Sequence, residues 1–240
     1  MKIKYIVTGT GRCGTVFMAR FFTSIGVLCG HETIFDYKGL DEAIRRINKD
    51  VKLELSGCSS LKYNPDSNSY DEVDWHPDIQ NINADSSYMS APYLNEEILK
   101  DVIIIHVVRN PLNVINSFCN HLNYFKNKYP TNPYEEFIFQ FVPELREKMD
   151  QYDRAALFYV KWNKMIQKST PHIFHKIEES PEHILKSLKI DSKEWYNDKN
   201  TNLFEKLKTD VFKNYNQIKS QEIKSELINM AYEYGYLNFI

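Results

Sequence analysis

Cysteine is scarce in this sequence of 240 residues and never occurs in the CxxC spacing that zinc knuckles use. The four cysteines, Cys13, Cys29, Cys58 and Cys119, are spread singly along the chain. A disulfide framework needs more cysteines in a much shorter chain. These absences exclude a zinc-ribbon protein and a disulfide-stabilised small domain, and we expect the thiols to be reduced.

Long hydrophobic runs are also missing. A membrane-spanning helix needs about 18 uninterrupted apolar residues, and no such stretch occurs. The N-terminal residues MKIKYIVTG contain too few apolar positions for a signal peptide and lead directly into a glycine-rich loop. The sequence therefore predicts a cytoplasmic protein without a membrane partner.

Neither sign of charge dominates, because 30 basic and 32 acidic residues give a formal net charge of -2. Proteins that bind nucleic acid usually carry a basic face and a high pI. We therefore expect no nucleic-acid partner. One local cluster of basic residues is typical of a solvated helix face. Binding of an anionic polysaccharide is the alternative interpretation of this cluster. Its members are Arg45, Arg46, Lys49 and Lys52.

The length and the order of the apolar segments predict one α/β domain over residues 1–240. Short β-branched runs alternate with segments in which apolar residues recur at helical spacing. The run DVIIIHVV at 101–108 is typical of a strand buried on both faces of a parallel sheet, so we place it at the sheet centre. Together the segments predict a three-layer α/β/α sandwich with a central parallel sheet.

The expected boundaries follow from the periodicity and from the capping residues. Asn110 is expected to cap a helix whose first residue is Pro111. Residues 56–85 are expected to be largely irregular, with 79–85 (IQNINAD) as a candidate extended stretch before a helical turn at 89–94. We expect further strands at 3–7, 27–30 and 172–178, and further helices at 15–25, 39–50, 134–149, 152–167, 180–188 and 220–236.

Residues 9–15, GTGRCGT, form a glycine-rich loop behind the first predicted strand. Main-chain N–H groups at a helix N-terminus hold anions, and Arg12 adds a full positive charge. The loop fits the dinucleotide pattern GxGxxG, with Glu32 18 residues past the last glycine as the ribose-binding acid. It departs from the magnesium-dependent pattern GxxxxGK[ST], because Thr15 and Val16 replace the lysine and the hydroxyl residue. A Rossmann-type oxidoreductase that uses NAD(P) thus remains open.

Three segments together resemble one known family. GTGRCGTVF resembles the 5'-phosphosulfate loop of sulfotransferases that use 3'-phosphoadenosine 5'-phosphosulfate (PAPS), a P-loop-like turn that works without metal. HVVRNPLNVINSF resembles the 3'-phosphate site of that family, and Arg109 and Ser117 stand where its arginine and serine hold the phosphate. CGHETIF is similar to the segment of tyrosylprotein-type enzymes that carries a glutamate base, which Glu32 matches.

The chain departs from the patterns of particular family members at three places. Arg12 stands where cytosolic sulfotransferases have a lysine, which matches the tyrosylprotein type. In ADSSYMSAPYL, which resembles a stretch of heparan-type enzymes, Asp85 stands where those enzymes carry a lysine. The resemblance therefore supplies no second catalytic cation at this position. The GxxGxxK cofactor stretch of cytosolic sulfotransferases is absent, so we expect another loop, near DKNTNL at 198–203, to close over the nucleotide.

The resemblance implies an enzyme that moves a sulfuryl group from PAPS to a hydroxyl or amine and releases 3'-phosphoadenosine 5'-phosphate (PAP), without a metal. It implies Glu32 as the base, His31 as the second candidate base, and Arg12 as the group that stabilises the leaving phosphate. The acceptor, a carbohydrate, a peptidyl tyrosine or a small molecule, is expected near 56–85 and 121–145. The residues expected at the nucleotide are Thr10, Gly11, Arg12, Cys13, Gly14, Thr15, Val16, Phe17, Arg109 and Ser117.

Some alternatives stay open. Phe17 either stacks on the adenine, as in cytosolic relatives, or belongs to the core. Cys13 lies beside Arg12 at a helix N-terminus, a setting that lowers the pKa of a thiol, but we interpret it as a small loop residue because no histidine is adjacent for thiol catalysis. A non-catalytic nucleotide-binding protein on the same scaffold is the remaining alternative to an enzyme. The oligomeric state does not follow from the sequence.

Overall fold

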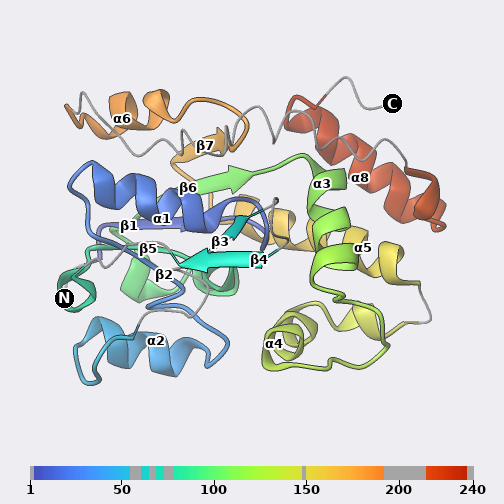
Figure 1. The fold of residues 1–240 in the computed structure, drawn as a ribbon, viewed down its shortest axis with the longest axis horizontal. Helices are drawn as coiled ribbons and strands as arrows, with labels where there is room; N and C mark the ends of the chain where they lie inside the picture. The colour runs from blue at the N-terminus through green and yellow to red at the C-terminus, as the bar shows by residue number, and fades with distance from the viewer. Residues whose placement is uncertain are drawn as a thin grey trace.

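A computed structural model describes residues 3–54, 61–64, 69–72, 78–147, 150–191 and 215–236 of the chain. A five-stranded sheet lies at its centre, with the order β2-β5-β1-β6-β7, and every pair of neighbouring strands is parallel (Figure 1). The strands are β1 (Tyr5–Thr8), β2 (Cys29–His31), β5 (Ala84–Ser86), β6 (Ile103–Val108) and β7 (Ile173–Lys176). A separate antiparallel hairpin is made of β3 (Leu61–Asn64) and β4 (Ser69–Glu72).

Helices surround this sheet (Figure 1). The α-helices are α1 (Thr15–Ser24), α2 (Leu40–Ile47), α3 (Pro111–Asn116), α4 (Pro133–Phe141), α5 (Gln151–Gln167), α6 (Glu182–Leu188) and α8 (Gln221–Glu233). A π-helical turn, η4 (Ser117–His121), continues α3. The short 3₁₀ turns are η1 (Ile79–Asn81), η2 (Tyr88–Tyr93), η3 (Glu97–Leu99), η5 (Pro143–Arg146) and η6 (Tyr215–Gln217).

Successive side chains of the central strands enter opposite cores, as the pleat of a strand requires. Ile6 and Ile104 join the larger core, which contains residues of α2, α3, α4, α5 and α8. Val7 and Ile105 join the smaller core, which contains residues of α1 and α6. The predicted three-layer α/β/α architecture is therefore confirmed.

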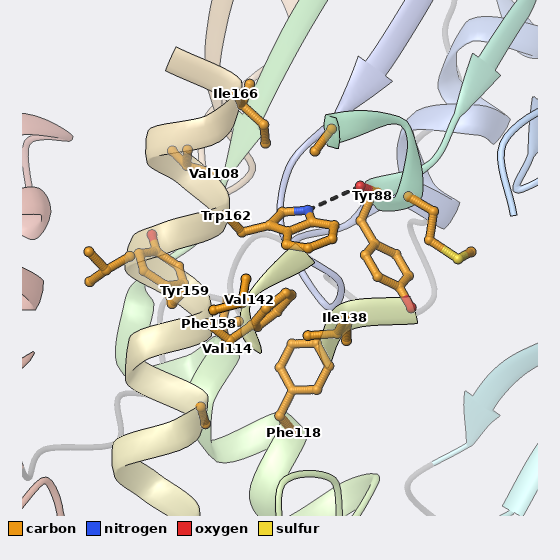
Figure 2. Packing of buried hydrophobic residues seen from close by; sticks show 14 of the residues in the cluster. Tyr88, Val108, Val114, Phe118, Ile138, Val142, Phe158, Tyr159, Trp162 and Ile166 are labelled. Carbon is orange, nitrogen blue, oxygen red and sulfur yellow. Dashed lines mark hydrogen bonds between the residues drawn. The ribbon is translucent and has the colours of Figure 1, made fainter. Parts of the chain in front are cut away.

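The larger core supports the glycine loop from below. Figure 2 shows its aromatic centre, where the indole Nε1 of Trp162 donates a hydrogen bond to the carbonyl oxygen of Tyr88 over 3.0 Å. The ring of Phe158 lies 5.0 Å from that of Trp162 and 5.3 Å from that of Phe118. A Cβ on Gly11 would stand only 2.9 Å from Cζ of Phe118, so the loop rests directly on this aromatic cluster.

Most predicted elements are confirmed, and the differences have local reasons. Asn110 caps α3 as predicted, because its Oδ1 accepts a hydrogen bond from the Leu112 N–H over 2.9 Å. The helix expected at 134–149 ends at Phe141, since Pro143 disfavours helical geometry in the residue before it. The segment expected to be irregular contains β3 and β4 within its described parts, and the candidate extended stretch at 79–85 overlaps β5. The strand predicted at the sheet centre, β6, lies between β1 and β7, and the central strand is β1.

Two buried histidines of the sheet stay neutral. Burial lowers the pKa of His106 to about 4 and, together with the neighbouring His183, that of His175 to about 3. The ring of His106 forms a 2.8 Å hydrogen bond through Nε2 with Oδ1 of Asn163. Neither ring nitrogen of His175 has a hydrogen-bond partner within the described ranges. A buried polar atom without a partner costs free energy, so His175 is a weak point of the sheet.

We expect His175→Phe to stabilise the protein, because it removes two buried nitrogens without hydrogen-bond partners within the described ranges. Each such atom destabilises the folded state by about 1 kcal/mol or more. The gain should grow below pH 6.5. There the unfolded chain binds a proton that the folded histidine, with its depressed pKa, does not, so the histidine lowers stability as the pH falls. Urea denaturation at pH 7 and pH 5 measures both effects. His106→Phe is the control, which should destabilise the protein at pH 7 by leaving the buried Oδ1 of Asn163 without its partner. A destabilised His175→Phe at both pH values would contradict this account.

Candidate active site

Three chain segments follow the carboxyl ends of parallel strands and so emerge at one edge of the sheet. They are the glycine loop after β1, His31 and Glu32 at the end of β2, and Arg109 after β6. Ligands of open α/β sheets bind at this edge. Hydrogen bonds link all three segments, so they form one site.

The glycines let the loop approach its surroundings more closely than a side chain would allow. A Cβ on Gly9 would stand 2.1 Å from the carbonyl oxygen of Val107 in β6. Gly14 caps α1 in the left-handed region, with φ of 99°, and a Cβ there would stand 2.5 Å from Cγ1 of Ile177. Both contacts are far shorter than any real Cβ contact, so the loop geometry requires glycine at these positions.

Arg12, Arg109 and Ser117, which the sequence placed at a nucleotide, lie together. Nε of Arg12 donates to Oγ of Ser117 over 2.9 Å. Nη1 of Arg109 donates to the main-chain carbonyl of Arg12 over 3.2 Å. No carboxylate in the described parts of the chain forms an ion pair with Arg12. The arrangement gathers two guanidinium groups beside a helix N-terminus, which suits a phosphate-bearing ligand.

The turn that carries Arg109 is fixed by partners that local sequence patterns did not indicate. The hydroxyl of Tyr159 in α5 donates to the carbonyl of Arg109 over 2.9 Å. The carboxylate of Glu178 accepts the N–H of Asn110 over 2.9 Å and the hydroxyl of Tyr236 over 2.8 Å. The C=O and the N–H of the single Arg109–Asn110 peptide are thereby bound by α5 and by the segment after β7, respectively.

His31 and Glu32 lie against the start of α1. Nε2 of His31 is 3.1 Å from Oγ1 of Thr15 and 3.9 Å from Oε1 of Glu32. Burial, followed by the charges of Arg20 and Arg12, lowers the pKa of His31 to about 3. The imidazole is therefore uncharged at neutral pH. Glu32 is buried as well and has a left-handed φ of 51°, which is uncommon for a residue with a side chain.

The remaining loop residues are placed as follows. Within the loop, the side chains of Thr10 and Cys13 are buried. Val16, at the start of α1, is partly exposed. Burial raises the pKa of Cys13 to about 12, and the opposing charge of Arg109 is the weaker influence. The expectation of a lowered thiol pKa is therefore wrong. Phe17 is buried in the smaller core and stacks on Phe21 with ring centres 6.4 Å apart, a placement that favours packing over adenine stacking.

One member of the basic cluster is not part of a solvated face. Arg45, Lys49 and Lys52 are exposed as predicted, but Arg46 is buried. Its guanidinium reaches back to the chain after β2, which makes it a structural cation rather than a surface charge. The loop proposed to cover the nucleotide, 198–203, lies outside the described residues.

The strand order defines the class of protein. In a Rossmann sheet the strand after the first crossover pairs with the first strand, whereas here β5 lies between β1 and β2. This order excludes the NAD(P)-dependent alternative and leaves an α/β protein with a P-loop-like anion site. The family model described as "Sulfotransferase domain" matches residues 2–229, and the chain belongs to the sulfotransferase family.

Membership makes this protein a PAPS-dependent sulfotransferase, an enzyme that takes a sulfuryl group from PAPS and yields PAP. A search among curated proteins found no match. No helix in the described ranges combines the length and the apolar character needed to cross a bilayer.

We expect Gly9→Ala to weaken PAP binding strongly, because a methyl group would push the loop away from β6 and from Arg109. Overpacking of this kind costs about 1–3 kcal/mol. Gly26→Ala is the matched control, since its φ of 85° makes alanine unfavourable while a Cβ there would meet no described atom within 4 Å. Both variants should lose stability, and only Gly9→Ala should lose PAP affinity in calorimetric titration. Equal PAP affinities would contradict the role of the loop contact.

Proposed function

We propose that the protein, acting as one domain over residues 1–240, transfers the sulfuryl group of PAPS to a hydroxyl or amine acceptor by in-line displacement without a metal. In this proposal Glu32 removes the acceptor proton. Arg12 and the loop N–H groups stabilise the 5'-phosphate that leaves, and Arg109 and Ser117 hold the 3'-phosphate. The acceptor class remains a carbohydrate, a peptidyl tyrosine or a small molecule.

The observation that carries the donor side is the pair of hydrogen bonds that joins Arg12 to Ser117 and Arg109 to Arg12. They bring the loop after β1 and the turn after β6 into one positively charged edge. Bound PAPS supplies a sulfuryl group with a good leaving group. Charge that develops on that leaving group is best stabilised by donors that are already in place, which is what a rigid loop and two anchored arginines provide.

The case against His31 as the base rests on electrostatics, and Glu32 is kept as the base by the resemblance. A general base works best when its pKa is near the working pH, and the pKa of His31 is lowered to about 3. Its Nε2 also faces the hydroxyl of Thr15 and the carboxylate of Glu32. These contacts support a role for His31 in orienting Glu32.

Glu32→Gln should reduce sulfuryl transfer by about 100-fold or more, since general base catalysis contributes about that much. Its affinity for PAP should not change, because the donor groups stay in place. Transfer from radiolabelled PAPS to a panel of sugars, tyrosyl peptides and small alcohols measures the rate and identifies the acceptor class. A variant as active as the wild type on the best acceptor would reject Glu32 as the base.

Arg109→Ala should lose discrimination between PAP and adenosine 5'-monophosphate, which lacks the 3'-phosphate. A charge-assisted hydrogen bond contributes about 2 kcal/mol, or roughly 30-fold in affinity. Titration calorimetry with both nucleotides measures the preference. Arg45→Ala removes the same charge from an exposed face and should keep the wild-type preference. If Arg109→Ala also kept it, the 3'-phosphate would have to be held elsewhere.

A further inference from the structure

The segment after Glu32, residues 33–36, is neither helix nor strand, yet its polar main-chain groups are buried and paired. Buried N–H and C=O groups require partners, and here side chains supply them instead of a ladder. The hydroxyl of Ser87 donates to the carbonyl of Phe35 over 2.7 Å. Ile34 and Phe35 are themselves almost fully buried, so the segment is fixed by packing as well as by hydrogen bonds.

Asp85, at the middle of β5, binds the N–H groups of this segment. Its carboxylate accepts hydrogen bonds from the N–H of Thr33 and from the N–H of Phe35, each over 3.0 Å. The side chain is fully buried, and burial raises the pKa of Asp85 to about 6 against the opposing influence of those N–H groups and of Arg46. At neutral pH the carboxylate is therefore ionised and is a strong acceptor for the segment.

Arg46 of α2 binds the carbonyl groups of the same segment. Its Nη1 lies 3.3 Å from the carbonyl oxygen of Thr33 and 3.2 Å from that of Ile34, and its Nη2 forms a 2.9 Å ion pair with Asp36. A buried anion thus holds the N–H groups while a buried cation holds the C=O groups. Removing either partner leaves the other groups of the segment buried without a partner.

Glu32 is the residue immediately before this fixed segment. Its left-handed φ of 51° is unfavourable for a residue with a Cβ by about 1 kcal/mol, so its surroundings must maintain it. Its N–H bonds the carbonyl of Ser86, the neighbour of Asp85, over 3.2 Å. The conformation of Glu32 therefore depends on the end of β5 and on the segment that Asp85 holds.

We propose that Asp85, assisted by Arg46, is a positioning residue that fixes the main chain of residues 32–36 and thereby aims the carboxylate of Glu32 at the acceptor. The inference rests on the proposed role of Glu32 as the base. It assigns a function to the aspartate that occupies the lysine position of heparan-type enzymes. Asp85 does not touch the reactants, so it acts on catalysis through Glu32.

A matched control separates positioning from mere stability. Asp153 of α5 is another buried aspartate whose carboxylate accepts two main-chain N–H groups, those of Lys219 and Ser220, over 2.8 and 3.1 Å. These bonds hold the start of α8. Asp85→Asn and Asp153→Asn remove the same charge from a buried main-chain contact, but Asp153 accepts both bonds at Oδ1 whereas Asp85 accepts one at each oxygen. Both variants should lower the melting temperature, Asp85→Asn by more.

Asp85→Asn and Asp153→Asn should differ in the position of Glu32 and in kcat. Crystal structures with PAP should show residues 32–36 displaced in Asp85→Asn and unchanged in Asp153→Asn. With the best acceptor of the panel, Asp85→Asn should lower kcat by about 10- to 100-fold at unchanged PAP affinity, as expected for a misplaced catalytic group. Asp153→Asn should keep the wild-type kcat. An undisplaced Glu32 in Asp85→Asn, or an equal loss of kcat in both variants, would overturn the proposal.

A double-mutant cycle tests whether Asp85 acts through Glu32. In the Glu32→Gln background, Asp85→Asn should cause no further loss of kcat, whereas independent effects would multiply. If Glu32→Gln alone retains the wild-type rate, the proposed role of Glu32 as the base fails. If Asp85→Asn retains the wild-type rate while Glu32→Gln does not, the positioning role of Asp85 fails. Should Asp85→Asn not fold, Arg46→Lys takes its place, because lysine keeps the charge but cannot bridge two carbonyls and a carboxylate.

Discussion

The close contact between the glycine loop and β6 brings Arg12 and Arg109, the two arginines proposed to bind the donor, to one edge of the sheet. Gly9 packs on the main-chain carbonyl of Val107, and the next strand residues lead to Arg109. Because β1 and β6 are paired in parallel, their carboxyl ends meet, and Arg109 reaches the carbonyl of Arg12. A loop held farther from β6 would separate the two guanidinium groups.

At two places, buried charged side chains that bind main-chain groups replace regular secondary structure. Asp85 and Arg46 hold the segment after β2 by its N–H and C=O groups, respectively. The loop after η4 is held in the same way. Glu135 accepts the N–H groups of Phe125 and Thr131 over 2.7 and 2.8 Å, and Arg154 donates to the carbonyl of Phe125. Each loop is thereby fixed without a strand partner, which satisfies its buried polar groups at the cost of burying two charges.

Local chemistry determined what the sequence could predict. The glycine loop, the Asn110 cap and the apolar strand at 101–108 depend on neighbouring residues, and the structure agrees with each. The roles of Asp85 and Arg46 depend on partners from about ten to more than fifty residues away in the sequence. From local patterns, Asp85 is interpreted only as the replacement of a lysine, and Arg46 as part of a solvated helix face. For Cys13, the sequence identified the positive surroundings, but the depth of burial, which outweighs them, is a property of the packed core.

The division of the site between two parts of the sheet bears on the acceptor. The groups proposed to bind the donor follow β1 and β6, whereas the proposed base, Glu32, follows β2 beside the segment that β5 and α2 hold. The chain beyond Glu32 reaches Tyr37, whose partly exposed ring makes an edge-on contact with Tyr134 of α4, with ring centres 5.1 Å apart. This contact joins the base segment to the aromatic stretch 121–145, where the acceptor is expected. Residues on this side can therefore change without disturbing the phosphate contacts, which explains why motifs for the donor leave the acceptor open.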